Sequence, residues 1–263
     1  MRVLVTGAGS GIGAATCRAL TDQGHDVVAT ARRTDALEHL DVAQHLSLDV
    51  TSDESVTNCV AEAGDIDALV NNAGINQSGP LESYDVATAQ RCFETNVIGP
   101  LRMINALVPA MRERRSGVVV NVTSVEGRVA APLAGIYCAT KHALEAMSES
   151  LHLEVAQFGV RVVIIEPGYI APGMKGASTH TEAGTVYEEL RNQWSGADET
   201  LVGPEGRPPP ELVGGAIAGA LADPKTALRV PVGADAELVL AARDQLDDAA
   251  FHAAMRQQLG LTW

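Results

Sequence analysis

The chain has 263 residues, of which 46% are hydrophobic and 20% charged, and its formal net charge is −14. A chain of this length and composition can bury one large core, which excludes general disorder and favours one α/β domain over two small ones. The acidic balance excludes nucleic acid as an expected partner, because binding a polyanion needs clustered Lys and Arg.

Seven short apolar runs alternate with longer helical patterns along the chain. Near-continuous apolar strands separated by helices are typical of a parallel sheet that is covered on both faces. The sequence therefore predicts an α/β fold with one doubly wound, Rossmann-like, seven-stranded parallel sheet, in a single domain over 1–263. Strands are expected at 2–6, 26–31, 45–49, 66–71, 117–123, 160–166 and 228–232, and helices at 11–23, 52–62, 84–113, 135–158, 209–222 and 236–258. Bends or breaks are expected within 84–113 at Pro100 and Pro109.

The first strand runs directly into a glycine-rich turn, TGAGSGIG at 6–13, and a helix follows. Glycine lets the backbone turn sharply and approach a phosphate closely, and the free N–H groups of a helix start attract a pyrophosphate. The turn begins where the strand ends, so Gly7, Gly11 and Gly13 fit the dinucleotide fingerprint better than a register that starts at Gly9. The segment predicts a nucleotide site, with a purely structural turn as the alternative. The expected contacts are Gly7, Ser10, Gly11, Ile12 and Gly13.

The end of the second strand indicates which nicotinamide nucleotide is bound. An acid about 20 residues past the glycines holds the ribose 2′-hydroxyl of NAD, whereas an arginine accommodates the 2′-phosphate of NADP. Here the strand ends ATARRT, so Ala31 leaves the acid position empty and Arg32 and Arg33 follow it. A guanidinium binds phosphate bidentately, and the sequence therefore predicts NADP(H). The alternative is that both arginines form a solvated strand end.

Two further strand ends are expected beside the cofactor. Asp49 ends the third strand, where it could contact the adenine or cap the next helix, a role for which Thr51 and Ser52 compete. NNAG at 71–74 follows the fourth strand, and amides are better suited to shaping this turn than to acid–base chemistry. The expected contacts here are Asp49, Val50, Asn72, Ala73 and Gly74.

The segment YCATK, residues 137–141, places a tyrosine and a lysine four residues apart near the start of a helix. Residues at i and i+4 share one helix face, so Tyr137 and Lys141 point into the same space. The pKa of tyrosine is ordinarily about 10, and a neighbouring ammonium lowers it by favouring the phenolate. Such a pair can protonate the alkoxide that forms when hydride reaches a carbonyl carbon. Ser124 ends strand 117–123, where an α/β sheet opens on its ligand crevice.

Each of these residues also has a structural interpretation, since Ser124 could be a turn residue and Tyr137 a half-buried aromatic.

The composition changes at 171–210, which is rich in Gly, Pro, Thr and Glu. A long irregular segment in one domain is expected to be a substrate lid, with a plain surface loop as the alternative. Met174, Tyr187 and Trp194 could make part of it apolar. A helical segment is expected at 234–263.

Six motifs in this order resemble the short-chain dehydrogenase/reductase superfamily, in its branch of single-domain enzymes of about this length. The motifs are TGAGSGIG at 6–13, NNAG at 71–74, Asn96 in ETNVIG, Ser124 in NVTSVEG, YCATK at 137–141 and EPG at 166–168. The resemblance covers nearly the whole chain to about residue 170 and is weaker beyond it. ATARR together with IEPG is similar to NADP-dependent members that act on retinol-like and hydroxysteroid-like compounds.

The resemblance implies roles for the matching residues. Lys141 would bind the nicotinamide ribose, Ser124 would hold the substrate oxygen, and Asn96 would support a water chain from Lys141 to solvent. Cofactor contacts at Pro167, Gly168 and Ile170 are also implied. In one departure, Pro172 stands where the family usually has a threonine that contacts the nicotinamide amide, and proline has neither a hydroxyl nor an N–H. Either the backbone near Ile170 makes this contact or the nicotinamide is held less firmly.

These residues predict an NADP(H)-dependent oxidoreductase that interconverts a ketone or aldehyde and its alcohol on a small, apolar substrate. A 3-oxoacyl-thioester reductase is the alternative, for which Arg112, Arg114 and Arg115 could form a basic entrance, although a solvated helix end explains them as well. A non-catalytic NADPH-binding regulator is a third possibility, but it would not need the acid–base set.

The remaining expectations concern partners and location. The seven histidines show no metal-ligand spacing, and Cys17, Cys59, Cys92 and Cys138 lie far apart, so neither a metal nor a disulfide is predicted. No leader and no run of about 18 apolar residues appears, so a cytoplasmic protein without a membrane partner is expected. By the resemblance, helices 84–113 and 135–158 would pair between subunits in a homodimer or homotetramer.

Overall fold

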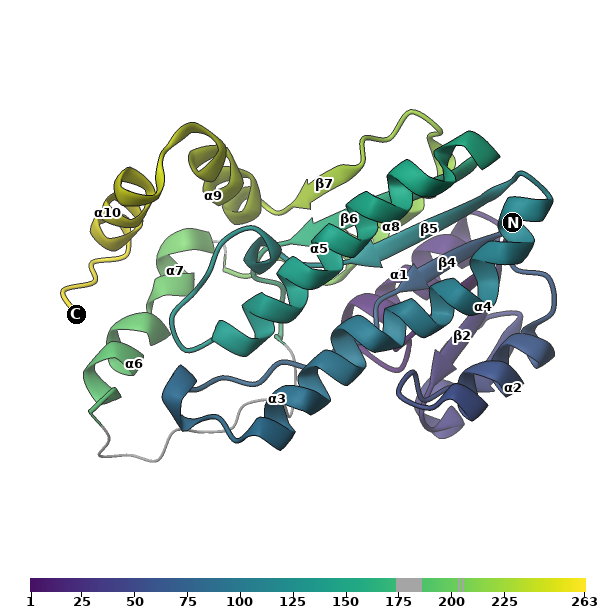
Figure 1. The fold of residues 1–263 in the computed structure, drawn as a ribbon, viewed down its shortest axis with the longest axis horizontal. Helices are drawn as coiled ribbons and strands as arrows, with labels where there is room; N and C mark the ends of the chain where they lie inside the picture. The colour runs from purple at the N-terminus through teal and green to yellow at the C-terminus, as the bar shows by residue number, and fades with distance from the viewer. Residues whose placement is uncertain (174–185, 203, 205) are drawn as a thin grey trace.

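The structure, a computed structural model, describes residues 1–173, 186–202, 204 and 206–263. Its strands form one seven-stranded parallel sheet with the order β3-β2-β1-β4-β5-β6-β7 (Figure 1). This confirms the predicted doubly wound architecture, and every predicted strand lies within two residues of an observed one at each end. The strands are β1 (Arg2–Val5), β2 (Asp26–Ala31), β3 (Gln44–Ser47), β4 (Ala68–Asn71), β5 (Gly117–Val122), β6 (Val160–Pro167) and β7 (Arg229–Val232).

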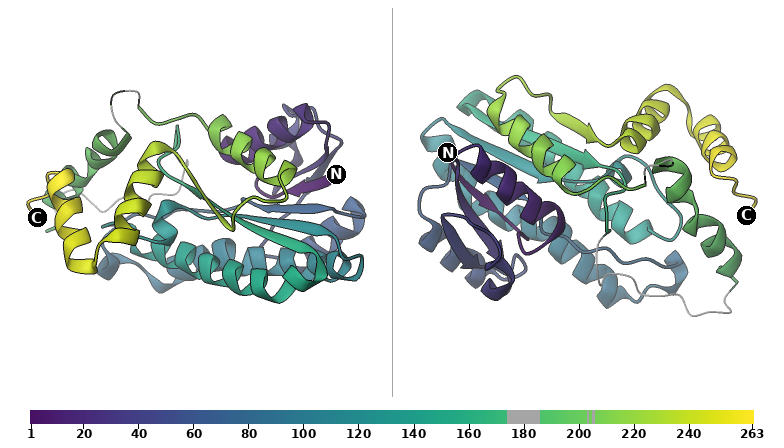
Figure 2. Two further views of the ribbon diagram at one scale, coloured as in Figure 1. Left: turned by 90° about the horizontal axis from the view of Figure 1, so that it is seen from above. Right: turned by 180° about the vertical axis from the view of Figure 1, so that it is seen from behind.

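Helices cover both faces of this sheet, as the two views in Figure 2 show. Successive side chains of a strand enter opposite faces. Val3 and Val5 of β1 join the core beneath α1 and α8, and Leu4 joins the core beneath α2, α4 and α5. Burial on both faces explains why the strands are almost continuously apolar. These helices are α1 (Gly11–Asp22), α2 (Asp53–Ala63), α4 (Gly99–Glu113), α5 (Gly135–Val155) and α8 (Glu211–Ala222).

Helices α1 and α8 pack against each other with almost no side chain between their backbones. A Cβ atom on Gly214 of α8 would lie 2.8 Å from the carbonyl oxygen of Ala15 in α1. At the ends of the two helices, Arg18 and Glu211 form an exposed ion pair at 3.1 Å. Helix α8, in the C-terminal fifth of the chain, therefore packs over α1, the first helix.

The predicted helix 84–113 is interrupted, as its two prolines suggested, but only near the first of them. It consists of α3 (Val86–Phe93), a π-helical turn η3 (Glu94–Ile98) and α4. Pro100 lies in the first turn of α4, directly after η3, and has no N–H to donate to the carbonyl of Asn96 four residues earlier, whereas Pro109 lies inside α4 without ending it. The interruption at η3 contains Asn96, and π-helical turns are frequent at functional sites.

The C-terminal half of the molecule is more helical than expected. The predicted helix 236–258 divides into α9 (Ala234–Gln245) and α10 (Asp248–Gln258), because the Asp247 side chain caps α10 by accepting from the Ala250 N–H at 2.8 Å. Segment 171–210 contains α6 (Glu188–Ser195) and α7 (Ala197–Val202) and is therefore not wholly irregular. Met174, within 174–185, lies outside the described residues. The short 3-10 turns are η1 (Thr34–Leu37), η2 (Leu81–Ser83), η4 (Val125–Gly127) and η5 (Ala156–Phe158).

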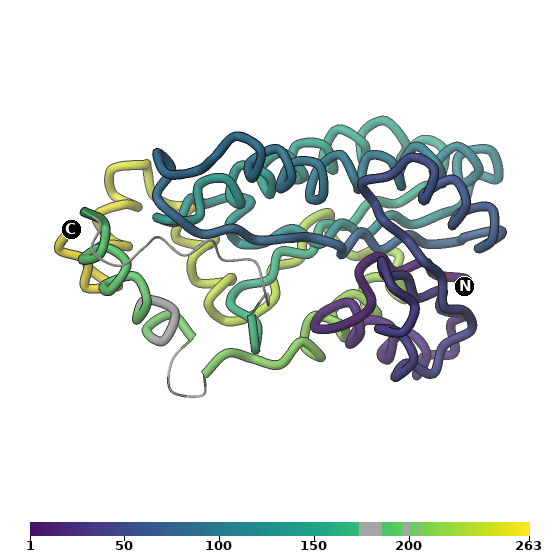
Figure 3. The backbone as a smooth tube through the Cα atoms, turned by 90° about the horizontal axis from the view of Figure 1, so that it is seen from below, coloured from purple at the N-terminus to yellow at the C-terminus, as the bar shows by residue number. Residues whose placement is uncertain are grey.

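Helices α6, α7, α9 and α10 gather at the end of the molecule that carries the C-terminus, and the N-terminus lies at the opposite end (Figure 3). The carboxyl ends of the strands point toward these helices (Figure 1). Among the described residues, no helix combines the length and the apolar character that crossing a membrane needs. The four cysteines are free and buried, each within a helix.

Candidate active site

A cleft of about 1680 Å³ opens at the carboxyl ends of the strands. It extends from the glycine turn after β1, past the ends of β4 and β5, to the C-terminal helices. Arg33 and Asn96 are the two predicted site residues that do not border it. The others line one continuous cavity: Gly7, Ser10, Gly11, Ile12, Gly13, Arg32, Asp49, Val50, Asn72, Ala73, Gly74, Ser124, Tyr137, Lys141, Pro167, Gly168 and Ile170.

The glycine turn requires its glycines for two different reasons. Gly7 and Gly11 have φ angles of +67° and +54°, in the left-handed region that favours glycine. Gly13 is required by space, because a Cβ there would lie 2.3 Å from the Gly7 carbonyl oxygen. The Asn72 side chain fixes the turn by donating to the carbonyls of Thr6 and Gly7 at 2.9 and 3.2 Å. The first turn of α1 contains no acid, so its positive end and this cradle fit a pyrophosphate.

The two arginines after β2 differ in their surroundings. Arg33 forms an exposed ion pair with Asp35 at 2.6 Å and does not line the cleft. Arg32 is exposed and lines the cleft. Burial raises the pKa of Asp49, but the hydrogen bonds from Thr51 and the charge of Arg32 outweigh burial and hold that pKa below its usual value. Arg32 is therefore the arginine that lies at the nucleotide end of the cleft.

Asp49 does not cap α2, which is one of its two predicted roles. Its Oδ1 accepts from the backbone N–H and the hydroxyl of Thr51 at 3.0 and 2.7 Å. Ser52 is the cap, with its hydroxyl accepting from the Ser55 N–H at 3.2 Å. Asp49 thus stabilises the loop between β3 and α2 while bordering the cleft.

Asn96 holds the loop that follows β4 against α5. Its Nδ2 donates to the Ile75 carbonyl at 2.8 Å and to the Thr140 hydroxyl at 3.0 Å, and its Oδ1 accepts from the Ile75 N–H at 2.8 Å. The side chain is buried, with 1% of its surface exposed. Both amide donors are engaged within the protein, so the side chain fixes the local backbone, and the water chain that the resemblance implied stays a prediction.

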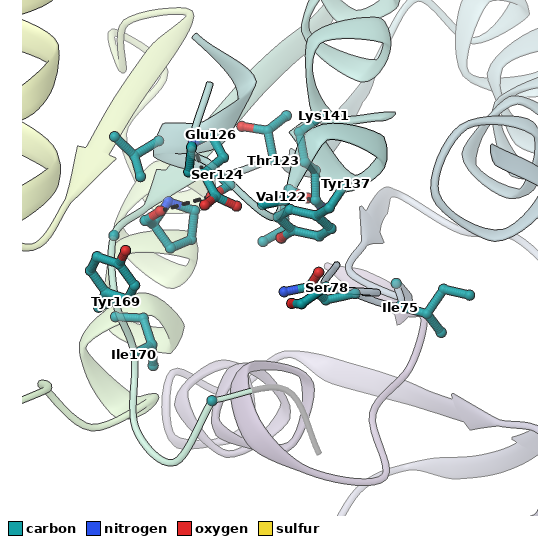
Figure 4. Close-up of a pocket in the computed structure, with 18 of the residues that line it drawn as sticks. Ile75, Ser78, Val122, Thr123, Ser124, Glu126, Tyr137, Lys141, Tyr169 and Ile170 are labelled. Atoms are coloured by element: carbon teal, nitrogen blue, oxygen red, sulfur yellow. Dashed lines mark hydrogen bonds between the residues drawn. The ribbon is translucent and has the colours of Figure 1, made fainter. Parts of the chain in front are cut away.

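Ser124, Tyr137 and Lys141 lie together on one wall of the cleft (Figure 4). Ser124 begins the turn η4, where its hydroxyl accepts from the Glu126 N–H at 3.1 Å. Tyr137 and Lys141 project from α5, with Lys141 Nζ 5.5 Å from the centroid of the Tyr137 ring. That ammonium donates to the Val122 carbonyl at 2.8 Å, which ties α5 to the end of β5.

The pKa of Tyr137 differs from the expectation in direction. Burial raises this pKa above its ordinary value and the charge of Glu126 raises it further, while a hydrogen bond with Ser124 lowers it. Burial also lowers the pKa of Lys141 to about 8, against the charges of Glu145 and Glu126. Withdrawal of the phenolate from water outweighs the hydrogen bond with Ser124, so in this structure Tyr137 is a protonated phenol that can donate.

Sequence reasoning left Glu126 without a role, although its carboxyl group faces the same part of the cleft (Figure 4). Burial raises its pKa to about 7, against the charge of Lys141. A perturbed carboxyl group in a cleft is a signal of a functional site that only the folded structure provides.

The segment after β6 is fixed from the opposite side by α9. Asp235 of α9 accepts from the Tyr169 N–H at 2.6 Å, and a Cβ on Gly168 would lie 2.1 Å from the same carboxylate. The Ala171 N–H donates to the Pro208 carbonyl at 2.9 Å, while Pro172 itself lines the cleft. The Ala171 N–H is therefore already engaged and cannot replace the missing threonine hydroxyl.

The basic residues that the sequence offered as an entrance for an acyl carrier lie elsewhere. Arg112 ends α4, and Arg114 and Arg115 follow it just before the amino end of β5. Arg114 donates to the Ser116 carbonyl at 2.9 Å and Arg115 to the Gln157 carbonyl at 2.8 Å. None of the three lines the cleft, which opens at the opposite edge of the sheet.

Glu166, which precedes Pro167, is fully buried, and neither of its carboxyl oxygens has a hydrogen-bond partner among the described residues. Burial and the charge of Glu145 raise its pKa from 4.5 to about 7, against Arg128, whose Nη1 is 3.9 Å away. The folded state therefore holds this proton more tightly than the unfolded state, and stability falls as the pH rises from 4.5 to 7. The variant Glu166→Gln has no proton to lose in this range. We therefore expect the difference in free energy of unfolding, variant minus native chain, to be about 2 kcal/mol larger at pH 8 than at pH 5.

Urea unfolding at the two pH values measures this difference. The matched control is Glu149→Gln, whose carboxylate is exposed and has a pKa lowered by its hydrogen bond to Arg229. This control should not become more stable relative to the native chain at pH 8. A pH-independent difference for Glu166→Gln would show that the carboxyl group does not titrate in this range.

Comparison with known proteins agrees with this architecture. The family model described as short chain dehydrogenase matches residues 1–183. An uncharacterized oxidoreductase of Schizosaccharomyces pombe is 36% identical over 209 residues, which are 79% of this chain and 87% of the relative. Retinol dehydrogenase 8 of Bos taurus is 38% identical over 188 residues, covering 66% of this chain and 60% of the relative.

Solved structures extend the similarity to nearly the whole chain. A short-chain dehydrogenase from Streptomyces avermitilis has a TM-score of 0.83 and 37% identity, covering 99% of this chain and 97% of that one. A short chain dehydrogenase from Burkholderia cenocepacia, solved in complex with NADP, has a TM-score of 0.79 and 30% identity, covering 97% and 96%. The glycine turn, the seven-stranded sheet and these matches lead to one conclusion: the chain is an oxidoreductase-family protein that belongs to the short-chain dehydrogenases.

Proposed function

We propose that the protein is an NADP(H)-dependent oxidoreductase that interconverts a ketone or aldehyde and the corresponding alcohol. The observation that carries the proposal is the placement of Ser124, Tyr137 and Lys141 on one wall of a cleft whose other end is the glycine turn. A non-catalytic binder of the nucleotide would have no use for a buried phenol and a buried ammonium at this place. The similar short chain dehydrogenase from Burkholderia cenocepacia was solved in complex with NADP, which supports the choice of cofactor.

In this proposal the protein's own residues bind, orient and exchange a proton. When bound, the nicotinamide cofactor supplies or accepts the hydride. Tyr137 donates its phenolic proton to the substrate oxygen during reduction and takes it back during oxidation. Ser124 orients that oxygen, and Lys141 keeps a positive charge beside the phenol as the proton leaves. Asn96 acts through position, because it fixes the loop after β4 against α5.

The cleft suits an apolar substrate. Beyond η4, the buried residues Val125, Val239 and Phe251 form a separate hydrophobic cluster, and all three line the cleft. Leu190 and Trp194 of α6 border the same region, so the described part of 171–210 can serve as a substrate lid. Retinol dehydrogenase 8, with which the chain shares 38% identity, is named for an apolar alcohol and supports this substrate class.

The cofactor preference is tested by fluorescence titration with NADPH and with NADH. We expect the native protein to bind NADPH at least about tenfold more tightly, a difference of about 1.4 kcal/mol. Arg32→Ala should remove most of this preference by weakening NADPH binding, because Arg32 lines the cleft. Arg33→Ala is the matched control, since its guanidinium is already paired with Asp35 outside the cleft.

Equal binding of NADH and NADPH by the native protein would contradict the cofactor assignment. The reaction itself is tested by loss of NADPH absorbance with a panel of apolar ketones and aldehydes. No turnover with any of them, despite tight NADPH binding, would instead favour the non-catalytic regulator.

We also propose a homodimer or homotetramer built through the outer surfaces of α4 and α5. Leu101 of α4 and Leu153 of α5 are 38% and 74% exposed, and apolar side chains on long surface helices suit a subunit interface. A cytoplasmic location likewise stays a prediction.

A further inference from the structure

Glu126 places a carboxyl group at the reacting end of the cleft. The turn η4 fixes its backbone, because the Glu126 N–H donates to the Ser124 hydroxyl at 3.1 Å. The side chain lies near Ser124, Tyr137 and Lys141 on the same wall (Figure 4). Its charge raises the pKa values of both Tyr137 and Lys141.

Within the described part of the chain, no residue donates a hydrogen bond to this carboxyl group. Lys141 is the cation that acts on it, but the ammonium donates to the Val122 carbonyl. The other acids that border the cleft differ: Asp49 accepts from Thr51, Asp235 accepts from the Tyr169 N–H, and Glu94 pairs with Arg102 at 2.6 Å. Glu126 is thus the acidic side chain of the cleft whose hydrogen-bonding capacity is left for a ligand.

The residues around Glu126 indicate which chemical groups such a ligand needs. Because burial raises the pKa of Glu126 to about 7, its ionised form predominates only above that pH. That ionised form only accepts hydrogen bonds, and its partial removal from water is costly unless a donor reaches it. Val125, directly before Glu126, and Val239 and Phe251 beyond it are apolar and buried, so they supply no side-chain donor. A bound apolar molecule would displace water from this place, and a donor on that molecule could then satisfy the carboxylate.

We propose that Glu126 determines specificity by accepting a hydrogen bond from a hydroxyl or amino group that the substrate carries close to its reacting carbon. The inference rests on the proposed function, because it assumes that the substrate oxygen lies at Ser124 and Tyr137. The hydrogen bond from the Glu126 N–H to the Ser124 hydroxyl, at 3.1 Å, places Glu126 beside the proposed position of the substrate oxygen, and both residues line the cleft. The substrate class is an apolar 1,2-diol or amino alcohol and the corresponding hydroxy or amino ketone.

Calorimetric titration of the NADPH-bound protein tests this recognition without any turnover. The probes are 1,2-heptanediol, 1-amino-2-heptanol, 1-methoxy-2-heptanol and 2-heptanol, which share a chain and differ in the group beside the carbinol. We expect the diol and the amino alcohol to bind at least about tenfold more tightly than the two probes without a donor, as a hydrogen bond to a charged group provides.

Variants separate recognition from structure. Glu126→Ala should reduce the affinity for the diol to that of the methoxy compound and leave 2-heptanol unchanged. Glu126→Gln keeps the shape and an acceptor oxygen but not the charge, so the diol should retain part of its advantage, while the amino alcohol loses the attraction of the charge. Glu94→Gln is the matched control, because Glu94 also borders the cleft but is paired with Arg102.

The outcomes distinguish the two proposals. Equal affinities for the diol and the methoxy compound in the native protein would overturn the role of Glu126, and so would an unchanged diol preference in Glu126→Ala. Reduction of 2-heptanone in the same preparation would show that the proposed oxidoreductase function stands even then. A diol preference that depends on Glu126, in a protein that reduces neither 2-heptanone nor 1-hydroxy-2-heptanone, would support the recognition and contradict the function.

Discussion

Replacing Tyr137 by Phe lowers the turnover of a reducible ketone by about 10³-fold, while the affinity for NADPH stays nearly unchanged. The substitution removes the hydroxyl that donates the proton but keeps the aromatic ring. Tyr137 is 8% exposed, so the ring continues to fill its place in the core. Steady-state kinetics monitored by NADPH absorbance measure the first effect, and the fluorescence titration measures the second.

Tyr84→Phe is the matched control for this experiment. The Tyr84 hydroxyl donates to the Gln77 carbonyl, outside the residues that line the cleft, so its loss should cost about 1 kcal/mol of stability and leave turnover nearly unchanged. Turnover by Tyr137→Phe at the native rate would mean that another group protonates the substrate, and the assignment of Tyr137 would be wrong.

The largest effect on stability is expected at Gly13. Gly13→Ala places a methyl group 2.3 Å from the Gly7 carbonyl oxygen and 2.6 Å from the Asn72 amide nitrogen. The turn and the Asn72 side chain must both move, so we expect a loss of about 3 kcal/mol in the free energy of unfolding and a marked loss of NADPH affinity. Urea unfolding and nucleotide titration measure the two effects.

Gly215→Ala makes the same chemical change in another helix and is the control. Gly215 is exposed on α8 and a Cβ there meets nothing within 4 Å, so the variant should gain up to about 1 kcal/mol from helix propensity. A Gly13→Ala protein as stable as the native one would show that the turn adapts easily, and the steric argument for its glycines would fail.

The sheet was predictable because its determinants are local. Runs such as VRVVIIE are apolar on both faces, which only a buried parallel strand tolerates, and glycines mark the ends of α1 and η5. The strand order brings the carboxyl ends of the parallel strands to one edge of the sheet, where right-handed connections place the loops that line the cleft. Residues from Gly7 to Ile170 therefore meet although they are far apart in sequence.

What the sequence could not provide depends on contacts between distant segments. The partner of Arg33 is two residues away, but nothing local decides that Arg33 rather than Arg32 turns toward Asp35. The amide of Asn96 is engaged by Ile75 and Thr140, which only the fold brings to it. The pKa of Tyr137 rises because burial and the charge of Glu126 outweigh the hydrogen bond with Ser124, and burial is a property of the whole cleft.

The close packing of α8 on α1 has a consequence for synthesis on the ribosome. A nascent chain that ends before residue 211 lacks the helix that packs on Ala15 of α1, so the core that Val213, Ile217 and Leu221 complete on this face of the sheet stays incomplete. Arg18 and Glu211 are 193 residues apart, and the growing chain spends most of its translation without that contact. The glycine turn, although it emerges first, should become competent for nucleotide only after nearly the whole chain has left the exit tunnel, and shielding of the uncovered face by a chaperone would matter most during that interval.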